Sequence, residues 1–184
     1  MIAYIAKFTI LIIILLPVYL VVRRPHEKKE GQFREIALSM FVLFMAALII
    51  LVLEGDYAKP STMLVRARYR LQNDVHINLE LFKTIRRYLI HPSINGIGIN
   101  LLGNTFMFMP WGFGLCALWK KNQTLRRVML FSLGFPIVIE FIQLFINRNV
   151  DIDDVLLNFL GSVLGALIYT FLRKKFPEFA LIEK

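Results

Sequence analysis

The sequence is poor in the residues that form disulfides, metal centres and the familiar catalytic motifs. Its single cysteine, Cys116, excludes a disulfide within the chain. Because Cys116 stands in an apolar run, we expect a small buried side chain rather than a reactive thiol. None of the three histidines has a second histidine at a metal-ligand spacing. The sequence also contains neither a Gly-rich phosphate loop nor a G-x-S-x-G nucleophile turn.

Acidic residues are scarce compared with basic ones. The chain has 13 Asp and Glu against 22 Lys and Arg, which gives a formal net charge of +9. No RNA- or DNA-binding motif accompanies this charge, so we expect no nucleic-acid partner. The hydrophobic fraction is 57%, above that of a soluble domain, and the mean hydropathy is positive. The composition therefore predicts an integral membrane protein, whose basic excess reports orientation and contact with anionic headgroups.

Long apolar runs occupy most of the sequence. A helix of about 18 residues rises about 27 Å, close to the thickness of the hydrocarbon layer. The runs that reach this length are Tyr4–Val22, Ile36–Leu53, Ile97–Trp119, Val128–Ile146 and Val155–Leu172. No small-residue cleavage site follows the first run, so we expect a retained helix and not a signal peptide. The sequence predicts an all-α membrane protein, a single domain over residues 1–184 with a bundle of about five transmembrane helices.

Lysine and arginine in the connecting segments predict the orientation. Three segments on one side of a five-span bundle are basic, with Arg23, Arg24, Lys28, Lys29 and Arg34 in the first, Lys120, Lys121, Arg126 and Arg127 in the second, and Arg173, Lys174 and Lys175 in the third. We expect that side to be cytoplasmic, with the N-terminus outside and the C-terminus inside. Residues 54–96 then lie outside although they are also basic, because long segments follow this rule poorly.

Residues 54–96 contain two patterned stretches. Apolar and polar residues alternate over residues 75–81, which predicts a short extended stretch. Over residues 81–90, one helical face carries Phe82, Ile85 and Leu89, and the other carries Lys83, Arg86 and Arg87. This pattern predicts an external helix that lies in the membrane interface and contacts headgroups through its basic residues. The alternative is a solvated loop helix packed on the bundle.

Glu140 stands in a long apolar run, where a carboxylate costs about 2.5–3.5 kcal/mol. Helical rise places it about 9 Å from the outer end of the fourth run. Polar residues on three runs reach the same layer, namely Asn100, Asn104, Glu140, Gln143, Asp154 and Asn158. We expect them to face one another, because polar groups facing lipid would lack partners. They form either a structural hydrogen-bond network or an outward-open polar cavity that binds or processes a ligand.

The loop between the fourth and fifth runs is acidic. We expect Asp153 or Asp154 to cap the fifth helix, where a carboxylate meets free backbone N–H groups. The alternative is a divalent cation held by Asp151, Asp153 and Asp154, although the spacing of an EF-hand loop is absent. Arg148 is placed to pair with Glu140 or an aspartate, or to hold an anionic headgroup.

Small residues and one proline mark expected features of helix packing. Gly161 and Gly165 have a small-xxx-small spacing that lets helix backbones approach closely. Pro110 predicts a bend in the third helix, because proline removes a backbone hydrogen bond.

Four blocks of the sequence carry a family pattern. They read INLELFKTIRRYL, NLLGNTFMFMPWGF, IEFIQLF and RNVDIDDVLLNFLGSVLG, and they fall within about residues 75–172. In this order they resemble the VanZ-like family, small membrane proteins named for a teicoplanin-resistance determinant of Gram-positive bacteria. One departure is Leu81, which stands where the family usually has proline. The first two apolar runs show no recognised family motif.

The resemblance implies a set of polar site residues and a location. By position, the family's polar set corresponds to Asn78, Asn100, Asn104, Glu140, Gln143, Arg148, Asp151, Asp154 and Asn158. The location implied is the bacterial plasma membrane, as part of the cell envelope. The phenotype implied is antibiotic resistance, in the form of reduced susceptibility to teicoplanin, a glycopeptide with an acyl tail. The family names no reaction.

Three functions are compatible with these residues. The first is a non-enzymatic protein that engages an anionic lipid, a lipid-linked envelope component or a lipoglycopeptide antibiotic. The second is a membrane-embedded enzyme acting on a phospholipid or polyprenyl-linked substrate, with Glu140 as general base and Asp151 or Asp154 holding a cation. The third is a small transporter in which Glu140 carries a proton. We expect no cofactor, and the divalent cation remains an alternative.

Overall fold

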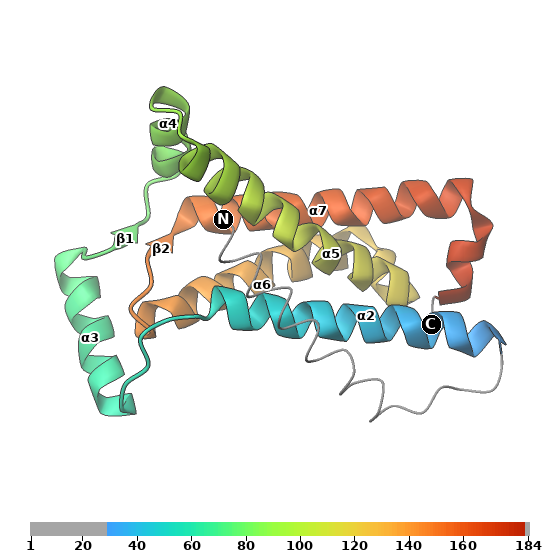
Figure 1. Cartoon of the computed structure of the whole chain (residues 1–184), viewed down its shortest axis with the longest axis horizontal. Helices are drawn as coiled ribbons and strands as arrows, with labels where there is room; N and C mark the ends of the chain where they lie inside the picture. Colours follow the sequence, from blue (N-terminus) through green and yellow to red (C-terminus); the bar gives the residue numbers. More distant parts are fainter. Residues whose placement is uncertain (1–28, 183–184) are drawn as a thin grey trace.

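A computed structural model describes residues 29–182 of the chain, and most of these residues lie in helices (Figure 1). The long helices are α2 (Lys29–Val52), α5 (Gly103–Leu118), α6 (Leu125–Phe145) and α7 (Ile152–Lys175), and the π-helix η1 (Ile94–Leu102) leads into α5. The shorter elements are α3 (Pro60–Asn73), β1 (Ile77–Asn78), α4 (Lys83–Ile90), the 3-10 helix η2 (Lys120–Gln123), β2 (Val150–Asp151) and the 3-10 helix η3 (Pro177–Ile182). The predicted all-α membrane bundle is confirmed.

Within the described chain, the segments long and apolar enough to cross a membrane are Gly31–Val52, Gly96–Leu118, Leu125–Phe145 and Ile152–Lys175. They match the last four of the five predicted runs, whereas the first, Tyr4–Val22, lies outside the described residues. α2 begins earlier than its apolar run. Lys29 and Arg34 therefore belong to this helix, and their predicted place in a loop was wrong. The chain is a multi-pass membrane protein.

The described spans run in alternating directions along the bundle (Figure 1). One end of the bundle, called the α3–α4 end below, carries α3, α4 and the β1–β2 pair, and the opposite end carries η2 and η3. Because the number of described spans is even, α2 begins and α7 ends at the same end of the bundle.

α5 and α7 form the most extensive contact between two helices in the described chain. A Cβ added to Gly161 would lie 2.0 Å from the carbonyl oxygen of Thr105, and one added to Gly165 would lie 1.9 Å from that of Met109. Both distances are far below van der Waals contact, so only glycine permits this approach of the two backbones. The close packing predicted from the small-xxx-small spacing is confirmed.

The span formed by η1 and α5 departs from α-helical geometry in its first half. The hydrogen bonds of a π-helix join residues five apart, which widens the turn. Gly96 lies in this stretch, and a Cβ added to it would lie 2.4 Å from the ring of Tyr88. The absence of a side chain at this position therefore allows α4 to pack against η1. Further along, α5 runs without interruption from Gly103 to Leu118, with Pro110 inside it. Pro110 therefore does not end the helix.

Residues 54–96 fold onto the α3–α4 end of the bundle. Within them, β1 pairs in parallel with β2, so that Ile77–Asn78 lies beside Val150–Asp151. The predicted extended stretch is thereby confirmed. α3 was not predicted, although Pro60 in its first turn is a recognised signal for a helix start.

Arg70 of α3 ties this segment to the end of α6. Its side chain is buried, with the residue only 3% exposed. The guanidinium donates to the carbonyl oxygen of Leu144 at 2.7 Å, to that of His76 at 3.2 Å and to that of Arg148. Leu144 lies in the last turn of α6, where carbonyl groups lack helical partners and favour a cation. This one side chain thus joins α3, the start of β1 and the loop that leads to α7.

Candidate ligand-binding cavity

A cavity of about 690 Å³ lies at the α3–α4 end, between α2, η1, α5, α6 and α7. Its wall contains seven of the predicted site residues, namely Asn100, Asn104, Glu140, Gln143, Arg148, Asp154 and Asn158. The lining residues Asn147 and Asn149 are exposed, whereas Glu140, Gln143 and Asn158 are buried. The cavity therefore has a wet mouth and a buried polar inner end. The structure brings together the polar residues whose depths along three separate runs were matched from the sequence.

Glu140 is held in a fixed direction by the loop that follows its helix. The residue is 6% exposed, and its Oε2 accepts a hydrogen bond from the backbone N–H of Asp151 at 3.0 Å. Its second oxygen, Oε1, has no hydrogen bond to the described protein. A buried carboxylate needs compensating hydrogen bonds, and one backbone donor supplies only part of them. Glu140 therefore retains the capacity to accept from a group inside the cavity.

The amides that line the cavity use their N–H groups on the protein itself. Asn104 donates to Asp154 Oδ1 at 2.7 Å, which joins α5 to α7. Gln143 donates to the backbone carbonyl of Val52 at 2.8 Å, at the last residue of α2. These bonds join four helices, α5 to α7 and α6 to α2, around the cavity.

Two further cavity residues connect it to the 54–96 segment. Asn100 donates to the hydroxyl of Tyr88 at 3.0 Å, which joins η1 to α4. Arg148 donates through Nη1 to the carbonyl oxygen of Glu54 at 3.0 Å. It makes no ion pair with a carboxylate in the described chain, so the predicted pairing with Glu140 or an aspartate was wrong. The guanidinium of Arg148 instead bonds the backbone of the loop after α2.

Asn158 is the lining residue whose side-chain oxygen is buried without a partner in the described protein. The residue is 4% exposed, and its Oδ1 has no hydrogen bond to the described protein. Leaving such a group unpaired costs about 1–3 kcal/mol. An unpaired polar group beside a cavity points to a bound molecule that supplies the missing bond.

Asn78 and Asp151 lie outside the cavity lining and serve the architecture of the α3–α4 end. Asn78 Nδ2 donates to Asp151 Oδ1 at 2.9 Å, and Thr84 Oγ1 donates to Asp151 Oδ2 at 2.5 Å. Asp151 also caps α7, because its side chain accepts from the N–H of Asp153 at 2.9 Å. The prediction that Asp153 or Asp154 caps this helix was therefore wrong by position.

Asp153 lies in α7, but its side chain caps the start of another helix, α4. It is fully buried, and its two oxygens accept from the backbone N–H groups of Phe82 at 2.6 Å, Thr84 at 2.8 Å and Ile85 at 3.1 Å. These donors are N–H groups at the start of α4, which have no helical partner, and they lie 68 to 71 positions earlier in the chain. The carboxylate replaces the capping side chain that α4 lacks in its own sequence.

The three aspartates of this loop do not form a common ligand set. Asp151 bonds Asn78 and Thr84, Asp153 bonds the start of α4, and Asp154 bonds Asn104. No group of three or more His, Cys, Asp or Glu side chains suited to a metal ion occurs within residues 29–182. The cation site suggested by the aspartate-rich loop is therefore not formed by this geometry.

The basic helix predicted from residues 81–90 is α4. Its basic residues Lys83, Arg86 and Arg87 are exposed, and so are the apolar side chains of Phe82 and Leu89. The face turned to the bundle instead carries the buried Thr84 and the half-buried Tyr88. Of the predicted apolar face, Phe82 and Leu89 are exposed and Ile85 is half-buried, so this face packs on the bundle only in part.

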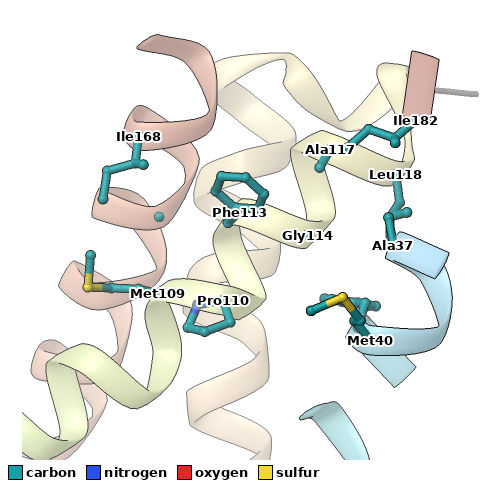
Figure 2. Close-up of a pocket in the computed structure, with 12 residues that line it drawn as sticks. Ala37, Met40, Met109, Pro110, Phe113, Gly114, Ala117, Leu118, Ile168 and Ile182 are labelled. Atoms are coloured by element: carbon teal, nitrogen blue, oxygen red, sulfur yellow. The ribbon is translucent and has the colours of Figure 1, made fainter. Parts of the chain in front are cut away.

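A second cavity, of about 430 Å³, lies toward the opposite end of the bundle (Figure 2). Its walls come from α2, α5, α7 and η3, with Met40, Met109 and Phe113 among side chains that are almost all apolar. Along α2, the residues that line the two cavities are separated by Leu48 and its neighbours, which pack in the core with Phe108. The polar cavity is thus closed toward this end by apolar packing.

Several structural residues carried no usable signal in the sequence. Arg70 is buried, whereas nothing in the sequence distinguishes it from Arg66 and Arg68 on the same helix. Thr84 and Tyr88 face the bundle at a spacing of four, which could have marked them as the inner face of α4. Their partners lie on β2, α7 and η1, and no local pattern predicts those contacts.

The long apolar helices and their polar inner faces define the class as a multi-pass membrane protein with a buried polar cavity. The family model described as VanZ/LLP1 matches residues 38–173, most of the chain. The chain belongs to the VanZ/LLP1 family. The match begins within α2, before the four blocks that carry the resemblance in sequence. No match was found among curated proteins or among solved structures.

Proposed function

We propose that this VanZ/LLP1 protein binds a lipid or a lipidated ligand of the cell envelope in the polar cavity. The observation that carries the proposal is the buried inner end of that cavity, which Glu140 and Asn158 line and where Asn158 Oδ1 has no hydrogen-bond partner in the described protein. Buried polar groups in a membrane bundle are costly and mark ligand pathways and sites. A ligand that completes their hydrogen bonds offsets this cost.

The surroundings of the cavity support a ligand that resides at the membrane surface. α4 contacts both η1 and α7, which supply part of the cavity wall. Its exposed Lys83, Arg86 and Arg87 suit anionic headgroups, and the exposed Phe82 and Leu89 suit insertion among them. We place this end of the bundle at the outer face of the membrane, following the distribution of basic residues.

A ligand site at the outer face would be reached by lipid-linked wall precursors and by lipoglycopeptides. The phenotype associated with the family, reduced susceptibility to teicoplanin, is the outcome we propose for this chain as well. The protein would lower the amount of drug that reaches its target, either by holding the drug's acyl-bearing part or by altering the lipid surface where it gathers. No covalent step is required.

Two other functions receive less support from the geometry. The enzyme would need Asp151 or Asp154 to hold a cation, yet Asp151 is committed to Asn78, Thr84 and the start of α7. The transporter would need a path along the bundle, yet apolar core residues separate the two cavities. Non-covalent binding requires neither a cation held by these aspartates nor a path between the two cavities.

The proposal is tested by expressing variants in a teicoplanin-susceptible host. Glu140→Gln and Asn158→Leu change the cavity, and Glu178→Gln removes an exposed carboxylate on η3 as the matched control. We expect wild type and Glu178→Gln to raise the inhibitory concentration of teicoplanin, and both cavity variants to lose the effect at equal membrane abundance. Native mass spectrometry of each purified protein should show retained lipid in the first pair and less in the second. Full protection and full lipid retention in both cavity variants would rule the proposal out.

A further inference from the structure

The polar cavity keeps acceptor capacity on its carboxyl groups. Asn100, Asn104 and Gln143 each donate one amide N–H to a protein oxygen. Glu140 keeps one oxygen without a protein donor, and Asp154 is bonded through Oδ1 alone. A group that donates hydrogen bonds therefore suits these two carboxyl oxygens.

The charge of the lining points in the same direction. The ionisable residues of the wall are Glu54, Glu140, Asp154 and Arg148, three carboxylates against one guanidinium. Arg148 is half-buried in the loop near the mouth, whereas Glu140 lies at the buried inner end. The carboxyl group of Glu140 therefore lies deeper in the cavity than the guanidinium of Arg148.

We propose that the inner end of the cavity binds the primary ammonium group of a zwitterionic lipid headgroup, with the headgroup phosphate toward Arg148. This inference rests on the proposed function and names the chemistry that the ligand must carry. An ammonium has a positive charge and three donors, which match the free oxygens of Glu140 and Asp154 and the unpartnered Asn158 Oδ1. A divalent cation fits less well, since no cluster of three ligands occurs within the described residues.

The test compares lipids that differ only in the headgroup. Purified full-length protein is titrated with phosphatidylethanolamine, phosphatidylcholine and phosphatidylglycerol of equal acyl chains, and bound lipid is counted by native mass spectrometry. Phosphatidylcholine keeps the charge and loses every N–H donor, so we expect it to bind about tenfold or more weakly than phosphatidylethanolamine. Soluble phosphoethanolamine should compete with the lipid, and phosphocholine should not.

Variants connect this preference to the cavity. Asp154→Asn and Glu140→Gln each remove one charge at nearly constant shape, and each should reduce the preference for phosphatidylethanolamine severalfold. Glu178→Gln should leave it unchanged, and thermal unfolding of each variant checks that the fold is intact. Asn158→Asp adds an acceptor, and we expect it to keep or strengthen the preference.

The outcomes separate this inference from the broader function. Equal binding of all three lipids would overturn the ammonium assignment and leave lipid binding in place. So would a preference for phosphatidylglycerol that persists when Lys83, Arg86 and Arg87 of α4 are replaced by glutamine. An absence of binding for every lipid, with no lipid retained from the membrane, would overturn both. A preference for phosphatidylethanolamine that survives Glu140→Gln and Asp154→Asn would move the site elsewhere and also reject the assignment.

Discussion

At the scale of single residues, Asp153 has the most demanding role in the described chain. A fully buried carboxylate without a cationic partner is stable only when several donors surround it, and three backbone N–H groups do so here. The sequence placed Asp153 in an acidic loop that could hold a metal or cap α7. The structure instead uses it to start α4.

We expect Asp153→Asn to destabilise the protein because an amide presents one acceptor oxygen where two were used. Hydrogen bonds to a charged group contribute about 1.5–3 kcal/mol, which corresponds to a loss of about 3–12 °C in Tm for a chain of this size. The measurement is thermal unfolding in detergent. Asp74→Asn, at an exposed αL position that asparagine tolerates, is the control and should unfold like wild type. An equal Tm for Asp153→Asn would contradict the role given to this carboxylate.

Arg70 gives a second prediction at this scale. Its guanidinium reaches the carbonyl oxygens of Leu144, His76 and Arg148 at once, which a lysine ammonium cannot do. We therefore expect Arg70→Lys to lower the Tm almost as much as Arg70→Met. The exposed Arg68 on the same helix supplies matched controls, Arg68→Lys and Arg68→Met, which should be nearly silent. If Arg70→Lys unfolds at the wild-type temperature, a positive charge at this position is sufficient for stability and the three simultaneous hydrogen bonds are not needed.

At the scale of elements, the α5–α7 contact depends on the absence of side chains at its glycines. Gly161→Ala would place a Cβ 2.0 Å from the Thr105 carbonyl oxygen, so the helices must move apart. Overpacking of this kind costs about 1–3 kcal/mol. On α6, a Cβ added to Gly134 meets nothing within 4 Å, which makes Gly134→Ala a matched control. Intrinsic fluorescence during heating should show earlier unfolding for Gly161→Ala only, and equal curves for both variants would contradict the packing.

α4 provides the second prediction for an element. Replacing Lys83, Arg86 and Arg87 by glutamine should weaken the association with anionic lipid by about 1 kcal/mol for each charge. The measurement is the enrichment of phosphatidylglycerol around protein extracted in native nanodiscs. Arg86→Lys with Arg87→Lys keeps the charge and should keep the enrichment. Unchanged enrichment in the glutamine variant would exclude α4 from the interface.

At the scale of the whole molecule, the alternating spans make one measurement sufficient to orient the bundle. With Cys116→Ala as background, Asp74→Cys probes the α3–α4 end and Lys121→Cys probes η2 at the opposite end. We expect a membrane-impermeant maleimide to label intact cells only at position 74, and position 121 only after permeabilisation. The reverse pattern would place the polar cavity on the cytoplasmic side and remove the basis for contact with an extracellular drug.

The sequence by itself determined the spans, the extended stretch, the basic helix and the layer in which the polar residues of three runs lie. These features depend on local quantities, namely the length of an apolar run, its period and the constant rise of a helix. For this reason Asn104, Glu140, Asp154 and Asn158 could be matched in depth before their contacts were seen. α3 was not predicted because its sequence is short and polar and contains no long apolar run.

Only the tertiary structure decided which polar groups are consumed by the fold and which remain for a ligand. Asp151 and Asp153 differ from Asp154 by one to three positions, yet they turn to β1 and α4 while Asp154 turns to Asn104 and the cavity. The physical reason is that their donors come from segments 50 to 73 positions away, and a carboxylate is satisfied by whichever donors the packed helices bring to it. No local pattern in the chain records that choice.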